Sequence, residues 1–296
     1  MATRLPRDEL FAVDGLVAVV TGGGSGLGLM MASTLAANGA SKVYIVGRRE
    51  DRLKQAAAAL PGVLIPLPGD VTSQASLQSL ADRIRNETGH LDLLIANAGM
   101  SGPGLGAMSP RATASEFARA AWATPMADFD AVYALNCTAT YYTIVAFLDL
   151  LSEGNRRRRP SAEPHSQVIV TSSMVAFQRD PRYGFAYLSS KAALVSMVKS
   201  FATRSVDWGI RFNSIAPGLF PTEMSASALL PFRVSRDKEL DEEGAFARSF
   251  LPAERAGSHN DIAGVLLYLA SKAGAYVNGS IMLVDGGKMA TVPSTY

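Results

Sequence analysis

The sequence predicts a single α/β domain in which a doubly wound parallel sheet of about seven strands carries helices on both faces. Three observations predict this fold class. Short apolar runs alternate with longer helical segments along the chain, as successive βαβ units do. A glycine-rich turn separates the first apolar run from the first helical segment. With 296 residues, 48% of them hydrophobic, the chain can bury one large core and does not have a disordered composition.

The elements follow one another in order along the chain. The strands are runs of four to six largely apolar residues, which suit a parallel sheet that is buried on both faces. Local signals mark the helix boundaries, because Gly39 and Pro61-Gly62 close two helices and Ser73 is suited to be an N-cap. The predicted strands are residues 16–20, 43–46, 63–67, 91–96, 167–171, 210–215 and 281–284. The predicted helices are residues 26–38, 50–60, 73–88, 128–151, 187–207 and 261–271.

Three connections are longer than such a fold needs, namely residues 100–125, 152–166 and 217–257. The first and third leave the carboxyl edge of the sheet, where ligands bind in open α/β sheets. The second enters a strand and is expected on the opposite side. We therefore expect an N-terminal extension at residues 1–13, one domain at residues 14–296, and a lid over the substrate at about residues 218–257.

Composition argues against several classes of partner. The net charge of +2 gives no case for nucleic acid, and the four arginines at 156–159 are expected to form a solvated surface loop. The single cysteine, Cys137, permits no disulfide within the chain, and the three histidines lack metal-ligand spacing. We find no secretory signal and no uncharged apolar window of about 18 residues. We therefore expect a cytoplasmic protein with no metal, nucleic-acid or membrane partner.

The glycine-rich turn reads Thr21-Gly22-Gly23-Gly24-Ser25-Gly26-Leu27-Gly28 and opens the first helix. Glycines let the backbone approach a pyrophosphate closely, and a helix N-terminus offers it unpaired N–H groups. Between a strand and a helix, this turn predicts a dinucleotide site. Its spacing, T-G-x-x-x-G-x-G, differs from G-x-G-x-x-G and resembles that of the short-chain dehydrogenase/reductase family.

Further motifs extend this resemblance from about residue 14 to residue 287. Asp70-Val71 resembles the family's adenine contact, and Asn97-Ala98-Gly99 resembles its N-A-G motif. Pro217-Gly218 with Thr222 resembles the segment that holds the nicotinamide carboxamide. The resemblance implies a Rossmann-type, dinucleotide-binding catalytic domain with a nicotinamide cofactor. The residues implied in cofactor binding are Gly22, Gly24, Ser25, Gly26, Leu27, Gly28, Arg48, Arg49, Asp70, Val71, Asn97, Ala98, Gly99, Tyr187, Lys191, Pro217, Gly218 and Thr222.

The end of the second predicted strand indicates which nicotinamide cofactor is used. An acidic residue there would bond the ribose 2′-hydroxyl of NAD and repel the 2′-phosphate of NADP. Gly47 holds that position, and Arg48 and Arg49 follow it. Because a guanidinium can fork onto a phosphate, these residues favour NADP(H) over NAD(H). Ser25 argues the other way, since many NADP-preferring relatives have a basic residue there; the arginines would then be a solvated helix start.

Tyr187 and Lys191 lie four residues apart and so share one face of a predicted helix. A phenol with a pKa of about 10 carries protons poorly near neutral pH, and a neighbouring ammonium favours its phenolate. The resemblance implies that Tyr187 donates the proton, Lys191 assists it and binds the nicotinamide ribose, and Ser173 orients the substrate oxygen. Ser172 remains a competitor of Ser173. Asn136 matches the family's asparagine that holds a water linked to the lysine, and its alternative is a satisfied core polar group.

Apolar and aromatic residues lie near these motifs in the sequence. Met100, Phe177, Tyr183, Phe185 and Met224 predict a mostly apolar substrate pocket. The alternative is that they pack the core or a subunit interface.

The motifs together predict an NADP(H)-dependent oxidoreductase that interconverts a ketone and a secondary alcohol. We expect it to reduce a hydrophobic carbonyl compound of an acyl, polyketide-like or aromatic kind. The alternatives are alcohol or polyol oxidation with NAD(P), and a cofactor-binding scaffold without redox activity. Family members are commonly homodimers or homotetramers, and the apolar faces of helices 128–151 and 187–207 are compatible with this assembly.

Overall fold

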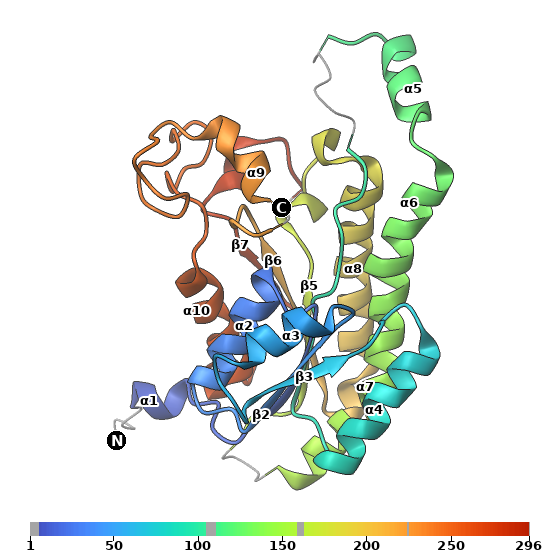
Figure 1. Cartoon of the computed structure of the whole chain (residues 1–296), viewed down its shortest axis with the longest axis vertical. Coiled ribbons are helices and arrows are strands. Elements are labelled where there is room, and N and C mark those ends of the chain that lie inside the picture. Colours follow the sequence, from blue (N-terminus) through green and yellow to red (C-terminus); the bar gives the residue numbers. More distant parts are fainter. Residues whose placement is uncertain (1–5, 105–110, 159–162, 224, 296) are drawn as a thin grey trace.

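The computed structural model describes residues 6–104, 111–158, 163–223 and 225–295. At its centre is one seven-stranded sheet in the order β3-β2-β1-β4-β5-β6-β7, and every neighbouring pair is parallel (Figure 1). The order steps outward from β1 in both directions, which is the doubly wound arrangement. The predicted fold class and strand number are therefore confirmed. Met224, predicted to line the substrate pocket, lies outside the described residues.

Each strand lies within one or two residues of its predicted limits. Strands β5 and β7 begin and end at the predicted residues. The strands are β1 Val17–Thr21, β2 Lys42–Gly47, β3 Leu64–Pro68, β4 Leu93–Ala96, β5 Gln167–Thr171, β6 Arg211–Pro217 and β7 Ile281–Val284. The helices are α1 Arg7–Leu10, α2 Gly26–Ala37, α3 Glu50–Ala57, α4 Gln74–Glu87, α5 Ala114–Trp122, α6 Met126–Tyr133, α7 Ala139–Arg157, α8 Phe185–Arg204, α9 Ala226–Leu229 and α10 His259–Ala270.

Two hydrophobic layers hold the sheet between its helices. Successive residues of β1 alternate between them: Val17 and Val19 enter one layer, and Ala18 and Val20 enter the other. The first layer is completed by α4, α7 and α8, and the second by α2, α3 and α10 (Figure 1). Both faces of the sheet are thereby covered, which explains why its strands read as unbroken apolar runs.

The long helix predicted at residues 128–151 differs from the observed one in two ways. A π-helical turn, Ala134–Thr138, joins α6 to α7, so the helical run is not uniform. The run also continues to Arg157, so Arg156 and Arg157 belong to the last helical turn and not to a loop. Their charges are suited to that place, because the carboxyl end of a helix carries a partial negative charge.

This helical run, Met126–Arg157, is long and apolar enough to cross a membrane by length and composition, and 39% of its most apolar window is buried in the protein. In the structure α7 packs against α4 and β4 and contributes Ile144 and Phe147 to the core. The hydrophobicity is therefore explained by burial of one side of the helix against the sheet.

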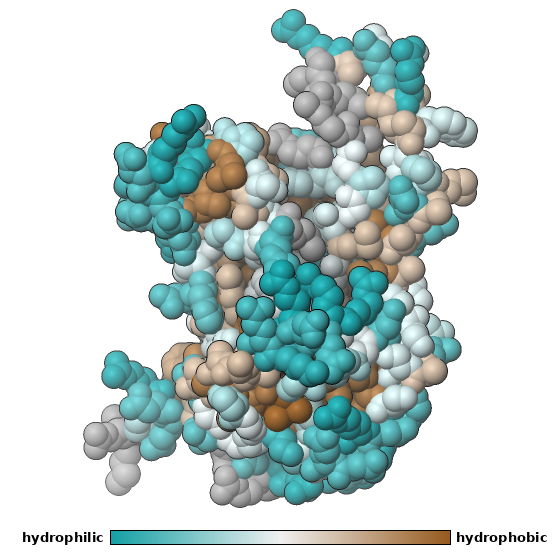
Figure 2. All heavy atoms as spheres, in the orientation of Figure 1, coloured by the Kyte–Doolittle hydropathy of each residue, from teal (hydrophilic) through white to brown (hydrophobic). Residues whose placement is uncertain are grey.

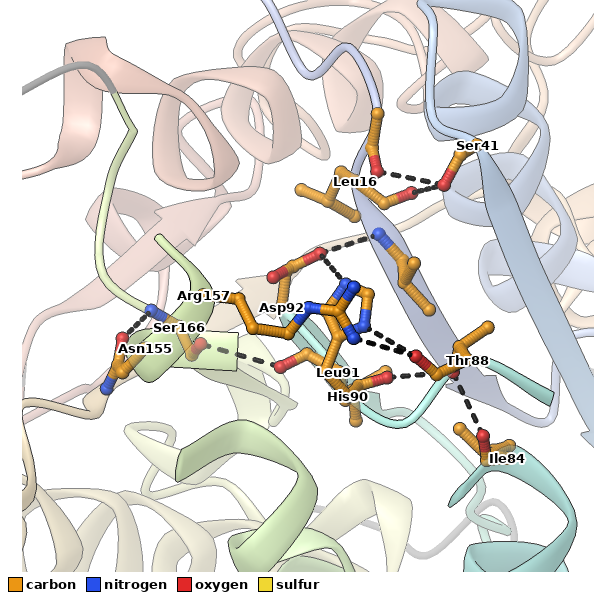
Figure 3. Close-up of polar contacts among 12 residues, drawn as sticks. Leu16, Ser41, Ile84, Thr88, His90, Leu91, Asp92, Asn155, Arg157 and Ser166 are labelled. Atoms are coloured by element: carbon orange, nitrogen blue, oxygen red, sulfur yellow. Dashed lines mark hydrogen bonds and ion pairs between the residues drawn. The ribbon is translucent and has the colours of Figure 1, made fainter. Parts of the chain in front are cut away.

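A polar cluster closes the amino edge of the sheet, opposite the carboxyl ends of the strands (Figure 3). The Asp92 carboxylate accepts a 2.8 Å hydrogen bond from the backbone N–H of Val17 and lies 3.6 Å from His90 Nε2. Arg157 donates to the carbonyl of Thr88 at 3.3 Å. Burial raises the pKa of Asp92. These contacts tie β1, β4 and α7 together, and the cluster is structural.

Candidate active site

A cleft of about 930 Å³ lies at the carboxyl ends of the strands. Its wall includes the glycine-rich turn, the ends of β2 and β4, the start of the loop after β6, and the first half of α8. Every residue that the sequence implied in cofactor binding lines this one cleft. Segments separated by up to two hundred positions in the chain therefore meet where open α/β sheets bind their ligands.

The glycine-rich turn leaves its backbone bare at the head of α2. Gly22 has a φ of +66°, a conformation that side chains other than glycine rarely adopt. A Cβ on Gly28 would lie 2.2 Å from the carbonyl oxygen of Gly22, so the turn and the helix pack too closely for any side chain. The turn therefore presents the first N–H groups of α2, a 12-residue helix, to the cleft.

The Asn97-Ala98-Gly99 segment is fastened to β1. The backbone N–H groups of Asn97 and Ala98 donate to Thr21 Oγ1 at 2.9 and 3.1 Å, and Asn97 Nδ2 donates to the Thr21 carbonyl at 3.0 Å. The Asn97 side chain thus holds the β1 and β4 ends in register while its backbone lines the cleft.

Basic side chains gather at the end of β2 and the start of α3. Arg48, Arg49 and Arg52 all line the cleft. Arg49 Nη2 lies 3.4 Å from Ser25 Oγ and 3.4 Å from a carboxylate oxygen of Glu223. Arg52 lies 3.5 Å from the other oxygen of the same carboxylate. The cleft therefore has a cationic corner beside the glycine-rich turn.

Asp70 borders this corner but is already satisfied locally. Its carboxylate accepts bonds from the backbone N–H of Thr72 at 2.9 Å and from the Thr72 hydroxyl at 2.7 Å. These bonds lower the pKa of Asp70. The carboxylate shapes the turn after β3, and Asp70 and Val71 face the cleft from there.

Ser173, Tyr187 and Lys191 come together at the deep end of the cleft. The Ser173 side chain is near enough to the Tyr187 hydroxyl to favour its ionised form. Lys191 Nζ donates to the carbonyl of Thr171 at 2.9 Å and lies 5.8 Å from the centre of the Tyr187 ring. Burial raises the pKa of Tyr187, and the Ser173 side chain acts in the opposite direction. Burial also lowers the pKa of Lys191 to about 8.

The two serines at the end of β5 have different surroundings. Ser172 Oγ donates to the backbone carbonyl of Lys191 at 2.9 Å, and the residue is 2% exposed. Ser173 Oγ contacts the Tyr187 hydroxyl and accepts from the backbone N–H of Val175 at 3.3 Å. The geometry therefore favours Ser173 over Ser172 as the serine that meets a substrate.

Asn136 is fully buried in the π-helical turn. Its side chain accepts from the Met100 N–H at 2.9 Å and donates to the Met100 carbonyl and to Ser190 Oγ, each at 3.0 Å. A Cβ on Gly99 would lie 3.0 Å from Asn136 Oδ1 and 3.5 Å from Lys191 Nζ. Asn136 is thus beside the lysine but outside the cleft wall, and its water-holding role stays a prediction.

The residues predicted for the substrate pocket are divided. Met100 lines the cleft. Phe177 and Tyr183 pack against a buried cluster formed by Met174, Val175 and Met289, which agrees with the core alternative, and Tyr187 joins them there. Phe185 is 47% exposed, and its ring meets Phe117 edge-on at 6.1 Å. Other apolar residues line the cleft instead: Ala131, Ala134, Leu135, Leu219 and Phe220.

Sequence reasoning missed two charged residues of the cleft, Arg52 and Glu223. Arg52 had a weak signal, because it lies in the first turn of the helix that follows Arg48 and Arg49. Glu223 had none, because 174 positions separate it from Arg49 and only the folded loop brings them together.

Comparison with known proteins agrees with this geometry. The family model described as enoyl-(acyl carrier protein) reductase matches residues 22–288. A short-chain dehydrogenase/reductase of Diaporthe leptostromiformis, PhomF, is 44% identical over 290 residues, which cover 97% of this chain and 96% of that protein.

Solved structures are similar over nearly the whole chain. The Pseudomonas aeruginosa RhlG/NADP active-site complex has a TM-score of 0.75 at 28% identity and covers 95% of this chain and 98% of its own. A 7α-hydroxysteroid dehydrogenase complexed with NADH and 7-oxo glycochenodeoxycholic acid has a TM-score of 0.74 at 27% identity and covers 96% and 98%. With this fold, this cleft and these relatives, the chain belongs to the short-chain dehydrogenase/reductase family of oxidoreductases.

Proposed function

We propose that the protein is an NADP(H)-dependent reductase that converts a hydrophobic ketone into a secondary alcohol. The observation that carries this proposal is the meeting of Ser173, Tyr187 and the buried Lys191 in the same cleft as the glycine-rich turn. A proton donor and a dinucleotide site in one cleft are what carbonyl reduction requires.

The residues present fit a nicotinamide dinucleotide. The bare backbone around Gly22 and Gly28 suits a pyrophosphate at the head of α2, since glycine at position 28 lets the helix start pack directly on the turn. Arg48 and Arg49 suit a 2′-phosphate, and no acidic residue stands at the end of β2 to bond a free 2′-hydroxyl. When bound, the nicotinamide supplies or accepts the hydride. The relatives' complexes contain NADP in one case and NADH in another, so the preference for NADP(H) rests on the arginines.

The protein's own residues manage the proton. Ser173 and Tyr187 hold the carbonyl oxygen with their two hydroxyls, and the Tyr187 hydroxyl gives its proton to that oxygen as the carbonyl carbon accepts the hydride. The alcohol leaves with both hydrogens, and the resulting phenolate is stabilised by the ammonium of Lys191 until it regains a proton from solvent. The reverse sequence oxidises the alcohol, and cofactor ratios decide the direction.

Apolar lining supports a hydrophobic substrate. Leu135, Leu219 and Phe220 join Met100 in the cleft wall, and they offer contact area to an acyl or aromatic chain but few hydrogen bonds. The matching family model is described as a reductase of acyl carrier protein substrates, and the steroid dehydrogenase relative holds a bulky ketone. We propose residues 218–257 as the lid, because they gather around a small core of their own that includes Phe246 and Leu251.

The test is NADPH consumption by the purified protein against a panel of acyl, polyketide-like, aromatic and sugar ketones. Tyr187→Phe removes only the hydroxyl, so turnover should fall at least about 100-fold while NADPH binding persists. Faster turnover of sugars than of apolar ketones would contradict the substrate class. Tight NADPH binding with no turnover of any ketone would favour the scaffold alternative.

We also propose a cytoplasmic homodimer or homotetramer. Tyr141, Tyr142 and Val145 are exposed along α7, on the side turned away from the sheet. Large apolar side chains gathered on one helix face are typical of subunit contacts. The single cysteine, Cys137, is consistent with a reducing compartment.

A further inference from the structure

The loop after β6 crosses the mouth of the cleft and reaches the cationic corner. One carboxylate oxygen of Glu223 lies 3.4 Å from Arg49 Nη2, and the other lies 3.5 Å from Arg52 Nη1. Both arginines belong to the other side of the cleft, where hydrophilic side chains gather over α3 (Figure 2). The loop and α3 are thus joined by one carboxylate shared between two guanidinium groups.

Hydrogen bonds within the loop hold the residues on either side of Glu223. Ser225 Oγ accepts from the Thr222 N–H at 3.1 Å, lies 3.0 Å from Thr222 Oγ1 and donates to the carbonyl of Phe220. Thr222 lies against the glycine-rich turn, since a Cβ on Gly26 would be 3.4 Å from it. Phe220, Thr222 and Ser225 are therefore tied together beside the glycine-rich turn, and Glu223 follows Thr222 in this loop.

We propose that Glu223 is a specificity-determining latch: its carboxylate occupies Arg49 and Arg52 at the subsite for the 2′-phosphate, and NADP(H) binds by displacing it. The inference rests on the proposed preference for NADP(H). Because β2 ends in Gly47, it has no acidic side chain of its own at the 2′-phosphate subsite. Under this proposal Glu223, from a distant loop, supplies the carboxylate that controls this subsite.

The charges explain why the exchange runs in this direction. A phosphate monoester carries about −1.5 to −2 charges at neutral pH and presents three oxygens, whereas the carboxylate carries one charge. The side chains of Glu223, Arg49 and Arg52 are 53%, 60% and 52% exposed, so water and salt weaken their ion pairs. The latch is therefore easily displaced by a phosphate, whereas NAD(H) brings no anion to the corner and leaves the ion pairs of Glu223 in place.

The test is the dissociation constant for NADP⁺ and for NAD⁺, measured by titration calorimetry on the full chain. Glu223→Gln keeps the size of the side chain and removes its charge. The variant should bind NADP⁺ about two- to tenfold more tightly than wild type, with NAD⁺ binding unchanged. The gain should shrink as salt is added. Glu50→Gln is the matched control, because Glu50 pairs with Lys54 on the same helix, 2.8 Å away, and should change neither constant.

Two results would overturn the latch. One is a Glu223→Gln variant whose NADP⁺ affinity is unchanged or weaker. The other is a variant that loses affinity for NAD⁺ without gaining any for NADP⁺, since Glu223 would then bond the ribose hydroxyls. The latch and the cofactor preference fail separately. A wild type that prefers NADP⁺ with no gain in the variant overturns the latch alone, and a wild type that prefers NAD⁺ with a gain for NADP⁺ in the variant overturns the preference alone.

Discussion

At the scale of single residues, the site depends on a cation that is kept away from water. Lys191 is 5% exposed, and its ammonium donates to a backbone carbonyl, that of Thr171, at 2.9 Å. Burial disfavours the charged form and lowers the pKa of Lys191 to about 8. The charge that we propose to stabilise the Tyr187 phenolate is therefore lost at mildly alkaline pH.

This pKa predicts the pH dependence of ketone reduction. Below pH 8 the ammonium is present, and as pH rises through about 8 it loses its proton, so kcat/KM for reduction should be level and then fall. The Tyr187 phenol keeps its proton over this range, because burial raises its pKa. Initial rates with NADPH at a series of pH values would check this.

Lys191→Arg is the informative variant, because a guanidinium stays charged throughout. Its alkaline fall should move to higher pH, even where the rate itself is reduced by the larger group. A wild-type profile that stays level to about pH 10 would show that the lysine charge does not limit the reaction.

The neighbouring serines provide a matched pair of variants. Ser173→Ala removes the hydroxyl that contacts Tyr187 and should lower kcat on the order of 100-fold. Ser172→Ala removes the bond to the Lys191 carbonyl and should cost about 1 kcal/mol of stability with most of kcat retained. Steady-state kinetics and urea denaturation of both variants would check this. A large loss of kcat in Ser172→Ala and a small one in Ser173→Ala would instead make Ser172 the catalytic serine.

At the scale of elements, the π-helical turn places Asn136. A π-turn inserts one residue into a helix and is frequent at functional sites. Here it joins α6 to α7 and directs Asn136 toward Met100 and Ser190, so that the loop after β4 is fixed to two helices. The uniform α-helix predicted at residues 128–151 does not contain this π-helical turn.

The start of α10 is held by one carboxylate that accepts four hydrogen bonds from two residues. Asp261 receives bonds of 2.7 and 2.9 Å from Arg255, and bonds of 2.7 Å from the N–H and the hydroxyl of Ser258. The Arg255 bonds, together with those from Ser258, lower the pKa of Asp261 well below its usual 3.8.

Asp261→Asn should therefore destabilise the protein by about 1–2 kcal/mol at neutral pH. The stabilisation from a depressed pKa is present above the unfolded value and is lost as pH falls toward the folded one. The difference between wild type and variant should thus shrink below pH 3.8, as urea denaturation at several pH values would show. Asp128→Asn, in the exposed first turn of α6, is the control. An equal difference at all pH values would contradict this role for Asp261.

At the scale of the whole molecule, one face of α7 exposes large apolar side chains in the described part of the chain. Tyr142 and Val145 are 39% and 41% exposed on α7, beside Tyr141, which packs on Phe201 at 5.9 Å. Burying them between two copies would remove apolar surface from water and stabilise an oligomer.

A charge placed on this face should therefore separate the subunits. Val145→Glu is expected to convert a dimer or tetramer into smaller species, as measured by light scattering after size-exclusion chromatography. Val234→Glu, which is 63% exposed in the lid segment, should leave the mass unchanged. A wild type that is already monomeric would contradict the proposed assembly.

The sequence by itself determined the fold class, the order of the strands along the chain, and the motif residues that line the cleft. Each of these depends on local signals: unbroken apolar runs for buried strands, glycines where the backbone is exposed, and a tyrosine and a lysine one helical turn apart. Such signals lie within a few neighbouring residues, so they can be recognised without knowing which distant segments they contact.

The tertiary structure alone decided the rest. It separated Ser172 from Ser173, which are adjacent in the chain but face different partners, and it moved Phe177 and Tyr183 from the predicted pocket into a buried cluster. It also brought Glu223 across 174 positions to Arg49. These outcomes depend on which surfaces meet when loops and helices pack, and no local pattern encodes that meeting.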